Sequence, residues 1–222
     1  MKEALKRKQM LGTWRIDPAL ARRIANLASV GKLRKFRKLE VLYEQGTTSG
    51  KFYLILSGLV QVSILRPDGV EVVLEYMGPE TVCGEGPAFD GLARFSRAQA
   101  VRDTQTIEFD ATQIESAFRQ HPEFATALLR VTSLKQRTLA VRLEHLSSRD
   151  PEVRIMDLLH RLKEMFAINY PGGRLLVTHL THEQIGSMTG TSRVTVTRAM
   201  RVLREQRKID IVDGHILVKT PL

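Results

Sequence analysis

Three patterns of hydrophobic and polar residues follow one another along this chain. From residue 33 to about residue 110, short apolar runs rich in β-branched and aromatic residues alternate with turn residues, and glycines recur about one strand apart. This spacing is typical of an antiparallel β-sandwich or β-roll. Within it, the Pro67-Asp68-Gly69 sequence predicts a hairpin turn. The segment at residues 17–29 begins with Asp17-Pro18, a pair that predicts a capped helix.

The second pattern has a helical period. Residues 111–120 predict a short helix, and a much longer one follows from Pro122 to about Ser147. One of its flanks carries Phe124, Ala127, Val131, Leu134, Thr138, Val141 and His145, and the other carries Leu128, Leu139, Leu143 and Leu146. Either one flank covers the sheet while the other meets a partner chain, or both are core contacts of a monomer. The length, roughly 25 residues against an average of about 11–12, favours a dimer. We expect its seam at Val131, Leu134, Thr138 and Val141.

The third pattern begins at Asp150-Pro151, which predicts the N-cap and first position of a new helix. A strand, a helix, a tight turn, a second helix and a hairpin are predicted after it. We therefore expect an α+β protein. Its parts are an N-terminal antiparallel β-roll with a preceding helix (1–121), a long dimerisation helix (122–149) and a winged helix-turn-helix (150–222).

Residues 181–200 carry the most specific pattern. Thr181 and Gln184 have the spacing of a capping box, Gly190 suits a left-handed turn, and Thr191 or Ser192 can cap the next helix. These features predict a helix-turn-helix, whose second helix enters the DNA major groove. The combined spacing favours this motif over a helical hairpin with a solvated basic face.

The second helix of this motif has an apolar face and a polar face. Its apolar residues are Val196, Ala199, Met200 and Leu203. Arginines on the other face can bond guanine O6 and N7, a valine methyl can meet a thymine methyl, and threonine hydroxyls suit phosphates. The Asp213-Gly214 turn predicts a hairpin that forms the wing. DNA contacts are expected at Thr181, His182, Thr191, Ser192, Arg193, Val194, Thr197 and Arg198.

Charge is distributed unevenly around a formal net of +10. Residues 1–40 hold 12 Lys or Arg against 3 Asp or Glu, residues 41–150 hold 11 against 14, and residues 151–222 hold 11 against 7. Both ends, but not the middle, therefore suit a polyanion. The basic stretch at residues 2–10 is either part of this surface or a solvated terminus.

The segments LYEQG, FYLILSGLVQV, PDGVEVVLEYMGP, CGEGPAF and LTHEQIGSMTGTSRVTVTRAMRVL together resemble the CRP/FNR family, the cyclic-AMP receptor protein and its relatives. The resemblance covers nearly the whole chain. It implies a cyclic-nucleotide-binding-like jelly roll that binds an effector, a dimerising helix and a winged-helix DNA reader. It further implies a homodimeric, sequence-specific transcriptional regulator that binds double-stranded promoter DNA, with RNA polymerase as a further partner if it is an activator.

The resemblance also implies a phosphate cassette that Gly84 and Glu85 open and that an arginine completes. The expected arginine position holds Phe95, whereas Arg94 fits a loop one residue shorter and Arg97 is a second candidate. The expected effector-site residues are Gly84, Glu85, Gly86, Arg94, Ser96, Arg97 and Thr138.

The family's adenine-contacting pair falls on Leu139 and Ala140, whose side chains cannot form hydrogen bonds. A cyclic nucleotide such as cyclic AMP is therefore one candidate effector. A different effector, or none, is the favoured alternative.

Other classes of function lack their residues. An enzyme would need a nucleophile–base pair or paired carboxylates, and the sequence has neither pattern, so no catalytic residue is expected. Cys83 is the single cysteine and the histidines have no recognised ligand spacing, so no metal site is expected either. No apolar run approaches the ~18 residues of a membrane span, and we expect a cytoplasmic protein with no membrane partner. One alternative is a cyclic-nucleotide-binding regulatory module of a larger assembly, without sequence-specific DNA binding.

Overall fold

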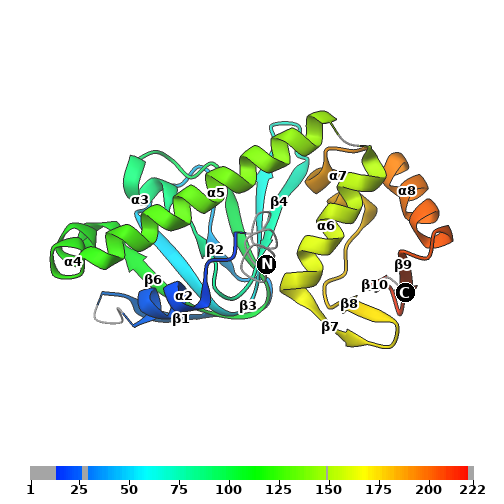
Figure 1. Ribbon diagram of the computed structural model, residues 1–222. Coiled ribbons are helices and arrows are strands. Elements are labelled where there is room, and N and C mark those ends of the chain that lie inside the picture. Colours follow the sequence, from blue (N-terminus) through cyan, green and yellow to red (C-terminus); the bar gives the residue numbers. More distant parts are fainter. Residues whose placement is uncertain (1–13, 27–29, 149, 220–222) are drawn as a thin grey trace. The chain divides into compact units, whose positions relative to one another are not determined.

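The computed structural model describes residues 14–26, 30–148 and 150–219, and the chain divides into two compact units, Met1–Leu139 and Ala140–Leu222. Figure 1 shows the strands of unit 1 and the helices of unit 2. The basic stretch at residues 2–10 lies outside the described residues. None of the helices in the described part of the chain is long and apolar enough to cross a membrane.

Unit 1 is built on an antiparallel sheet in which the two longest strands, β3 and β6, lie side by side. The sheet order is β1-β6-β3-β4, with β2 paired to β6 and β5 paired to β3. The fold class expected from the sequence is therefore confirmed. The elements are α2 (Pro18–Ala25), β1 (Lys32–Phe36), β2 (Val41–Tyr43), β3 (Lys51–Leu65), β4 (Glu71–Met77), β5 (Val82–Cys83), α3 (Gly86–Asp90), β6 (Arg97–Asp110), η1 (Ala111–Gln113), α4 (Ile114–Gln120) and α5 (Pro122–Ser148).

Local sequence explains the turns and bends of this sheet. Strands β3 and β4 are joined by the predicted hairpin, in which Arg66 N–H donates to Val70 O at 2.9 Å and Gly69 has a φ of 81°. The register of β3 against β6 shifts around Gly58, whose φ is 95°. A Cβ there would lie 2.5 Å from the Asp103 carbonyl oxygen, so only glycine allows the strands to approach so closely.

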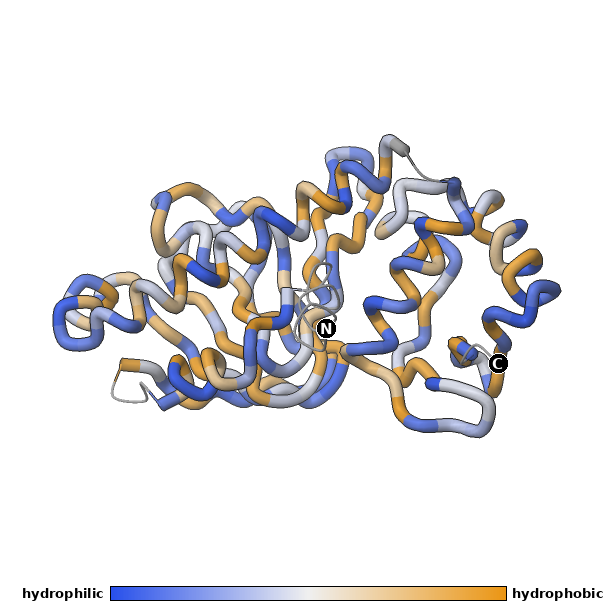
Figure 2. Tube along the Cα trace, in the orientation of Figure 1, coloured by the Kyte–Doolittle hydropathy of each residue, from blue (hydrophilic) through white to orange (hydrophobic). Residues whose placement is uncertain are grey.

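The first half of α5 completes the core of unit 1. Phe109 on β6 packs between Phe52 and Phe124, with ring centroids 5.1 and 5.2 Å away. Phe124 belongs to α5, and the same core includes Leu128 and Val131, which are 4% and 1% exposed. Figure 2 shows polar and apolar residues alternating along α5, so the helix has an inner and an outer face.

In the described residues of unit 2, the end of α5 is followed by three helices and a four-stranded sheet. They are α6 (Pro151–Phe166), β7 (Ala167–Tyr170), β8 (Gly173–Leu176), α7 (His182–Thr189), α8 (Arg193–Glu205), β9 (Ile209–Val212) and β10 (His215–Lys219). The sheet order is β7-β8-β10-β9, all antiparallel.

The structure corrects three details of the sequence prediction. Strand β7 was not predicted, because the Pro171-Gly172 turn was taken only as a helix end, whereas it joins β7 to β8. The short helix α3 was not predicted either. Asp150 occupies the N-cap position of α6, but its side chain makes no capping hydrogen bond.

Candidate DNA-binding and effector sites

Helices α7 and α8 form a helix-turn-helix whose termini follow local rules. The Thr181–Gln184 capping box starts α7, as predicted, with Gln184 N–H donating to Thr181 Oγ1 at 3.1 Å. Gly190 then takes a left-handed conformation with a φ of 61°. At Gly186 a Cβ would lie 2.6 Å from the Thr191 carbonyl oxygen, so glycine permits the close turn between the helices.

Of the two candidate caps for α8, Ser192 occupies the position, and its Oγ accepts from Thr195 N–H at 3.1 Å. The hydroxyls of Thr191 and Thr189 lie 2.8 Å apart in the turn. The side-chain oxygens of Thr181, Thr191 and Ser192 therefore all form hydrogen bonds within the motif. The first backbone N–H groups of α8 remain available to an anion.

Helix α8 separates buried and exposed residues as the sequence predicts. Its buried set, each at most 4% exposed, is Val196, Ala199, Met200 and Leu203. The exposed set is Arg193, Val194, Thr197 and Arg198, with Val194 at 62%. Within the described part of the chain no carboxylate holds Arg193 or Arg198, so the surface at the start of α8 has uncompensated positive charge.

His182 links the start of α7 to this surface. Its Nδ1 lies 2.9 Å from Thr197 Oγ1, and Thr197 Oγ1 donates to Arg193 O at 3.0 Å. The sequence predicted that His182 and Thr197 are both DNA-contacting residues, but it did not predict that they bond to each other.

The wing is the β9–β10 hairpin. Asp213 and Gly214 have φ values of 49° and 77°, which is the conformation of a two-residue type I′ turn. The turn is tied to the loop before α7, because His179 Nδ1 lies 3.2 Å from Gly214 O and the rings of His179 and His215 are 3.8 Å apart.

Unit 1 contains a cavity of about 140 Å³ at the turn from β5 into α3. Glu85 lies at its wall, 9% exposed, and Lys135 Nζ of α5 donates to Glu85 Oε1 at 2.5 Å and to Val82 O at 2.7 Å. Lys135 also lies 5.1 Å from the centre of the Trp14 ring, a cation–π contact.

Arg94 is the second buried cation of this cavity, at 3% exposed. Its guanidinium donates to Gly84 O at 3.1 Å, to Ser49 O at 3.0 Å and to Lys51 O, and it lies 4.2 Å from the Tyr43 ring centre. Its Nε is buried with no hydrogen-bond partner among the described residues. With Glu85 and Lys135 paired, Arg94 leaves the cavity wall with one uncompensated positive charge.

Burial keeps two neutral groups in the wall of this cavity, Cys83 and Tyr43, protonated. Burial raises the pKa of the Cys83 thiol to about 12, so Cys83 is a packing residue and not a reactive thiolate. Burial likewise raises the pKa of Tyr43 above its usual value, so its hydroxyl stays protonated. Among the described residues no group of three or more His, Cys, Asp or Glu side chains is placed to hold a metal ion.

The predicted effector residues divide into two groups. Gly84, Glu85, Gly86, Arg94 and Ser96 line the cavity. Arg97 and Thr138 are not among its lining residues: Arg97 Nε pairs with Glu44 Oε2 at 3.0 Å, and the buried Thr138 donates to Leu134 O at 2.9 Å. Of the two candidate arginines, Arg94 lines this cavity and Arg97 does not.

Several residues that line the cavity were not predicted from the sequence. They are Trp14, Tyr43, Val62, Met77, Cys83, Pro87, Phe95 and Lys135. Lys135 could have been found, since it is a cation on the helix expected to cover the roll. Trp14 could not, because nothing in the local sequence indicates that it reaches a cavity formed some 70 residues later.

The predicted dimer seam needs a correction at Val131 and Thr138. Their side chains are 1% and 0% exposed, so neither is at the surface, and Val131 lies in the core of unit 1. Leu134 is partly buried against the same core. The exposed leucines of α5 are instead Leu129, Leu139, Leu143 and Leu146, at 67%, 52%, 69% and 45%.

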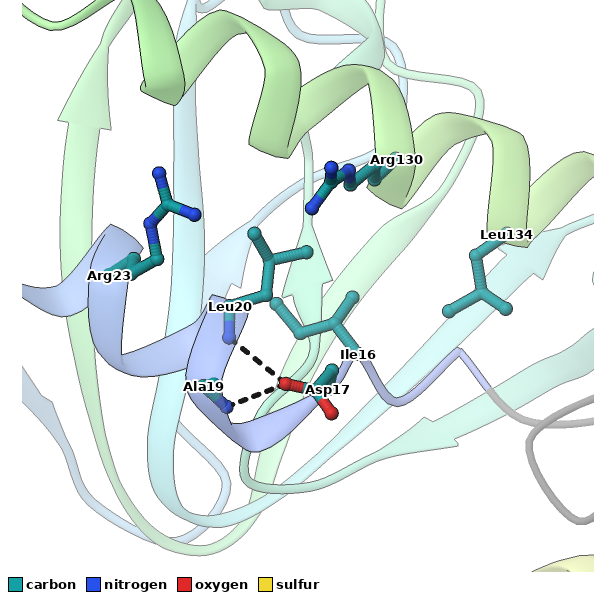
Figure 3. Close-up of a pocket in the computed structure, with 7 residues that line it drawn as sticks. All are labelled: Ile16, Asp17, Ala19, Leu20, Arg23, Arg130 and Leu134. Carbon is teal, nitrogen blue, oxygen red and sulfur yellow. Dashed lines mark hydrogen bonds between the residues drawn. The ribbon is translucent and has the colours of Figure 1, made fainter. Parts of the chain in front are cut away.

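A second hollow, of about 310 Å³, lies between α2 and the part of α5 in unit 1. Figure 3 shows its lining, with the guanidinium groups of Arg23 and Arg130 on one side and Leu134 on another. Asp17 is committed to capping α2, since its Oδ1 accepts from Ala19 N–H and Leu20 N–H. This hollow therefore has arginines at its rim but no buried polar group left to bind a ligand.

Comparison with known proteins matches both units. Residues 33–121 match the family model of the cyclic nucleotide-binding domain, and residues 153–221 match that of the Crp-like helix-turn-helix domain. The chain is 32% identical, over 184 residues and 82% of each chain, to the CRP-like cAMP-activated global transcriptional regulator of Mycobacterium tuberculosis. It is 26% identical over 206 residues, 92% of each chain, to the global nitrogen regulator of Synechocystis.

The fold is shared with a solved structure as well. The global regulator CLP of Xanthomonas campestris, described as responsive to c-di-GMP, superposes with a TM-score of 0.74 at 19% identity, over 90% of this chain and 100% of that one. At this identity the similarity establishes the fold alone.

Proposed function

This chain belongs to the CRP/FNR family of transcriptional regulators, and on that premise we propose how it binds promoter DNA and what it senses. It is a DNA-binding regulator with an effector-binding domain of the cyclic nucleotide-binding type. We propose that two copies bind an inverted repeat, that α8 of each copy enters the major groove, and that an anionic effector binds in the cavity of unit 1.

The observation that carries the DNA proposal is the polar surface at the start of α8. Arg193 and Arg198 are exposed and held by no carboxylate in the described residues, so both can reach guanine O6 and N7. Val194, 62% exposed beside them, cannot accept a hydrogen bond and suits a thymine methyl. The operator we propose has half-site centres about one helical turn apart, each with a G·C pair flanked by T·A pairs.

The effector proposal rests on Arg94. A guanidinium that is 3% exposed with a buried, unpartnered Nε is costly unless an anion lies near it. Glu85 is already paired with Lys135, so it does not supply that anion. A ligand with one negative charge would neutralise the site.

Two ligand classes satisfy this requirement. Cyclic AMP is one, supported by the family model and by the name of the Mycobacterium tuberculosis relative. A smaller, more apolar anion is the other, supported by the 140 Å³ volume and by the apolar Phe95 and Leu139 in the lining. Calorimetry with cyclic AMP, repeated on the Glu85→Ala variant, tests the first class: heat that the substitution removes favours the nucleotide, and no heat rules it out and leaves a different effector or none.

The dimer proposal uses the exposed leucines of α5. Leu139, Leu143 and Leu146 are separated by four and three residues, which is the spacing of a coiled-coil seam. The Leu143→Lys variant should sediment as a folded monomer, and should lose about 10²–10⁴-fold in operator affinity because the half-sites are no longer linked. Leu134→Lys should instead lower stability, since Leu134 packs on the core. A stable dimer of the Leu143→Lys variant would contradict this seam.

Three further points follow from this function. The protein would act in the cytoplasm, where its promoter DNA lies, and would contact RNA polymerase if it is an activator. We assign it no catalytic residue. Gel-shift titration of the full chain against sites selected from random DNA tests the whole proposal, and failure to enrich an inverted repeat would refute it.

A further inference from the structure

A short chain of hydrogen bonds joins α7 to the DNA-facing surface of α8. His182 Nδ1 lies 2.9 Å from Thr197 Oγ1, and Thr197 Oγ1 lies 3.0 Å from the carbonyl oxygen of Arg193, one helical turn earlier. Both distances are those of normal hydrogen bonds. His182 is partly buried and Thr197 is exposed, so the chain ends at the surface.

Counting donors fixes the direction of these bonds. A threonine hydroxyl has one hydrogen and two lone pairs, and a carbonyl oxygen can only accept. The bond to Arg193 O therefore uses the hydroxyl hydrogen of Thr197. Thr197 can then only accept from His182, which requires the imidazole hydrogen on Nδ1. If Thr197 instead donated to the ring, it would lose its bond to Arg193 O. That arrangement has one hydrogen bond, whereas the arrangement with His182 as donor has two.

We propose that His182 is a positioning residue that sets the base preference of Thr197. With its hydrogen committed to Arg193 and one lone pair committed to His182, Thr197 offers DNA one lone pair and a methyl group, and no donor. This inference rests on the proposed function, in which this face of α8 lies against base edges.

The consequence is a preference at the base that Thr197 meets. In the major groove guanine presents only acceptors, N7 and O6. Adenine and cytosine each present an amino donor, and thymine presents a methyl group beside its O4 acceptor. A lone pair on Thr197 meets a donor favourably and an acceptor unfavourably. Guanine is therefore disfavoured at that position on the contacted strand, by about three- to tenfold, the size of one neutral hydrogen bond.

The ring tautomer can be measured without DNA. Long-range ¹H–¹⁵N correlation spectra of the full chain, with His182 assigned by comparison with the His182→Gln variant, report which ring nitrogen carries the hydrogen. We expect Nδ1 protonated and Nε2 bare in the neutral ring. The opposite tautomer would overturn the inference, whether or not the protein binds DNA.

Base preference is measured by selecting sites from random DNA with the wild type and matched variants. Thr197→Val keeps the shape but removes the lone pair. His182→Ala removes one of the two bonds that hold the hydroxyl in this orientation, so turning its hydrogen towards DNA then costs only the bond to Arg193 O. Both should accept guanine three- to tenfold more readily at one base pair of each half-site, with other positions unchanged. Thr197→Ser keeps the hydroxyl and should show the wild-type preference. Glu183→Gln changes the residue next to His182 and should leave the base preferences unchanged.

The possible failures are distinguishable. If the wild type and the His182→Ala variant select identical sites, the positioning role is wrong while DNA recognition stands. If the wild type enriches no sequence at all, the proposed function fails, and the inference about base preference fails with it.

Discussion

The helix-turn-helix of unit 2 and the cavity of unit 1 are assembled in opposite ways. The residues that we propose to face DNA lie within 18 consecutive positions, from Thr181 to Arg198, and each is placed by a cap, a turn or a helical period. The cavity draws on Trp14, Tyr43, Glu85, Arg94 and Lys135, which five separate segments contribute. Local conformation builds the first site, and sheet pairing and helix packing build the second.

The two sites also differ in how their charges are satisfied. Arg193 and Arg198 are exposed and uncompensated, so they are available to a partner and contribute little to folding. Inside unit 1, Lys135 is paired with the Glu85 carboxylate, whereas Arg94 is held by carbonyl oxygens and by no carboxylate among the described residues. In the proposed function, the same residue types therefore serve DNA recognition in one unit and stability, together with effector binding, in the other.

The largest effect that separates the two sites is expected at Arg94. The Arg94→Ala variant leaves the carbonyls of Ser49 and Gly84 without this donor, so the free energy of unfolding should fall by about 3 kcal/mol or more. Urea denaturation measures it. Arg119→Ala, an exposed member of an ion pair on α4, should change stability by less than about 0.5 kcal/mol. Equal effects would mean that Arg94 is not structural.

A smaller loss is expected at Lys135. The Lys135→Met variant keeps the length of the side chain but leaves the Glu85 carboxylate without its cation, so stability should fall by about 2 kcal/mol. Adding Glu85→Gln should recover part of this loss, because the buried charge is then gone. A double-mutant cycle in urea gives the coupling, and additive effects would show that the pair contributes nothing.

In unit 2 the corresponding substitution should affect binding and leave stability unchanged. Arg198→Ala should weaken binding by about 1–3 kcal/mol at the guanine position alone, because a bidentate contact is lost. Its free energy of unfolding should stay within about 0.5 kcal/mol of the wild type. Competition gel shifts with single-base operator variants measure the first and urea denaturation the second. A uniform loss across all sequences would place Arg198 on a phosphate.

The subtlest test is a change of preference at Val194. The family resemblance implies a glutamate at this position in regulators that prefer TGTGA half-sites, and a glutamate can accept from cytosine N4. Val194→Glu should therefore shift selection from random DNA towards TGTGA-like sites without loss of overall affinity. Equal enrichment of TGTGA by the wild type would show that Val194 does not read this base pair.

Much of the architecture follows from the sequence by itself. The capping box at Thr181, the left-handed turn at Gly190 and the wing turn at Asp213-Gly214 were predicted and are present. Each depends on residues within a few positions of one another, whose side chains and allowed dihedral angles set the local backbone. The alternation of period 2 and period 3.6 similarly identified the β-roll and the long helix.

The tertiary structure decided which apolar residues of α5 turn inward and which residues meet in the cavity. Both flanks are apolar, and only packing against Phe109 and the rest of the roll buries Val131 of one flank and Leu128 of the other while Leu139 stays exposed. Trp14 and Lys135 reach the cavity because the chain folds back on itself over more than a hundred residues. Hydrophobic burial has no direction of its own, so the choice of face depends on surfaces far away in the sequence.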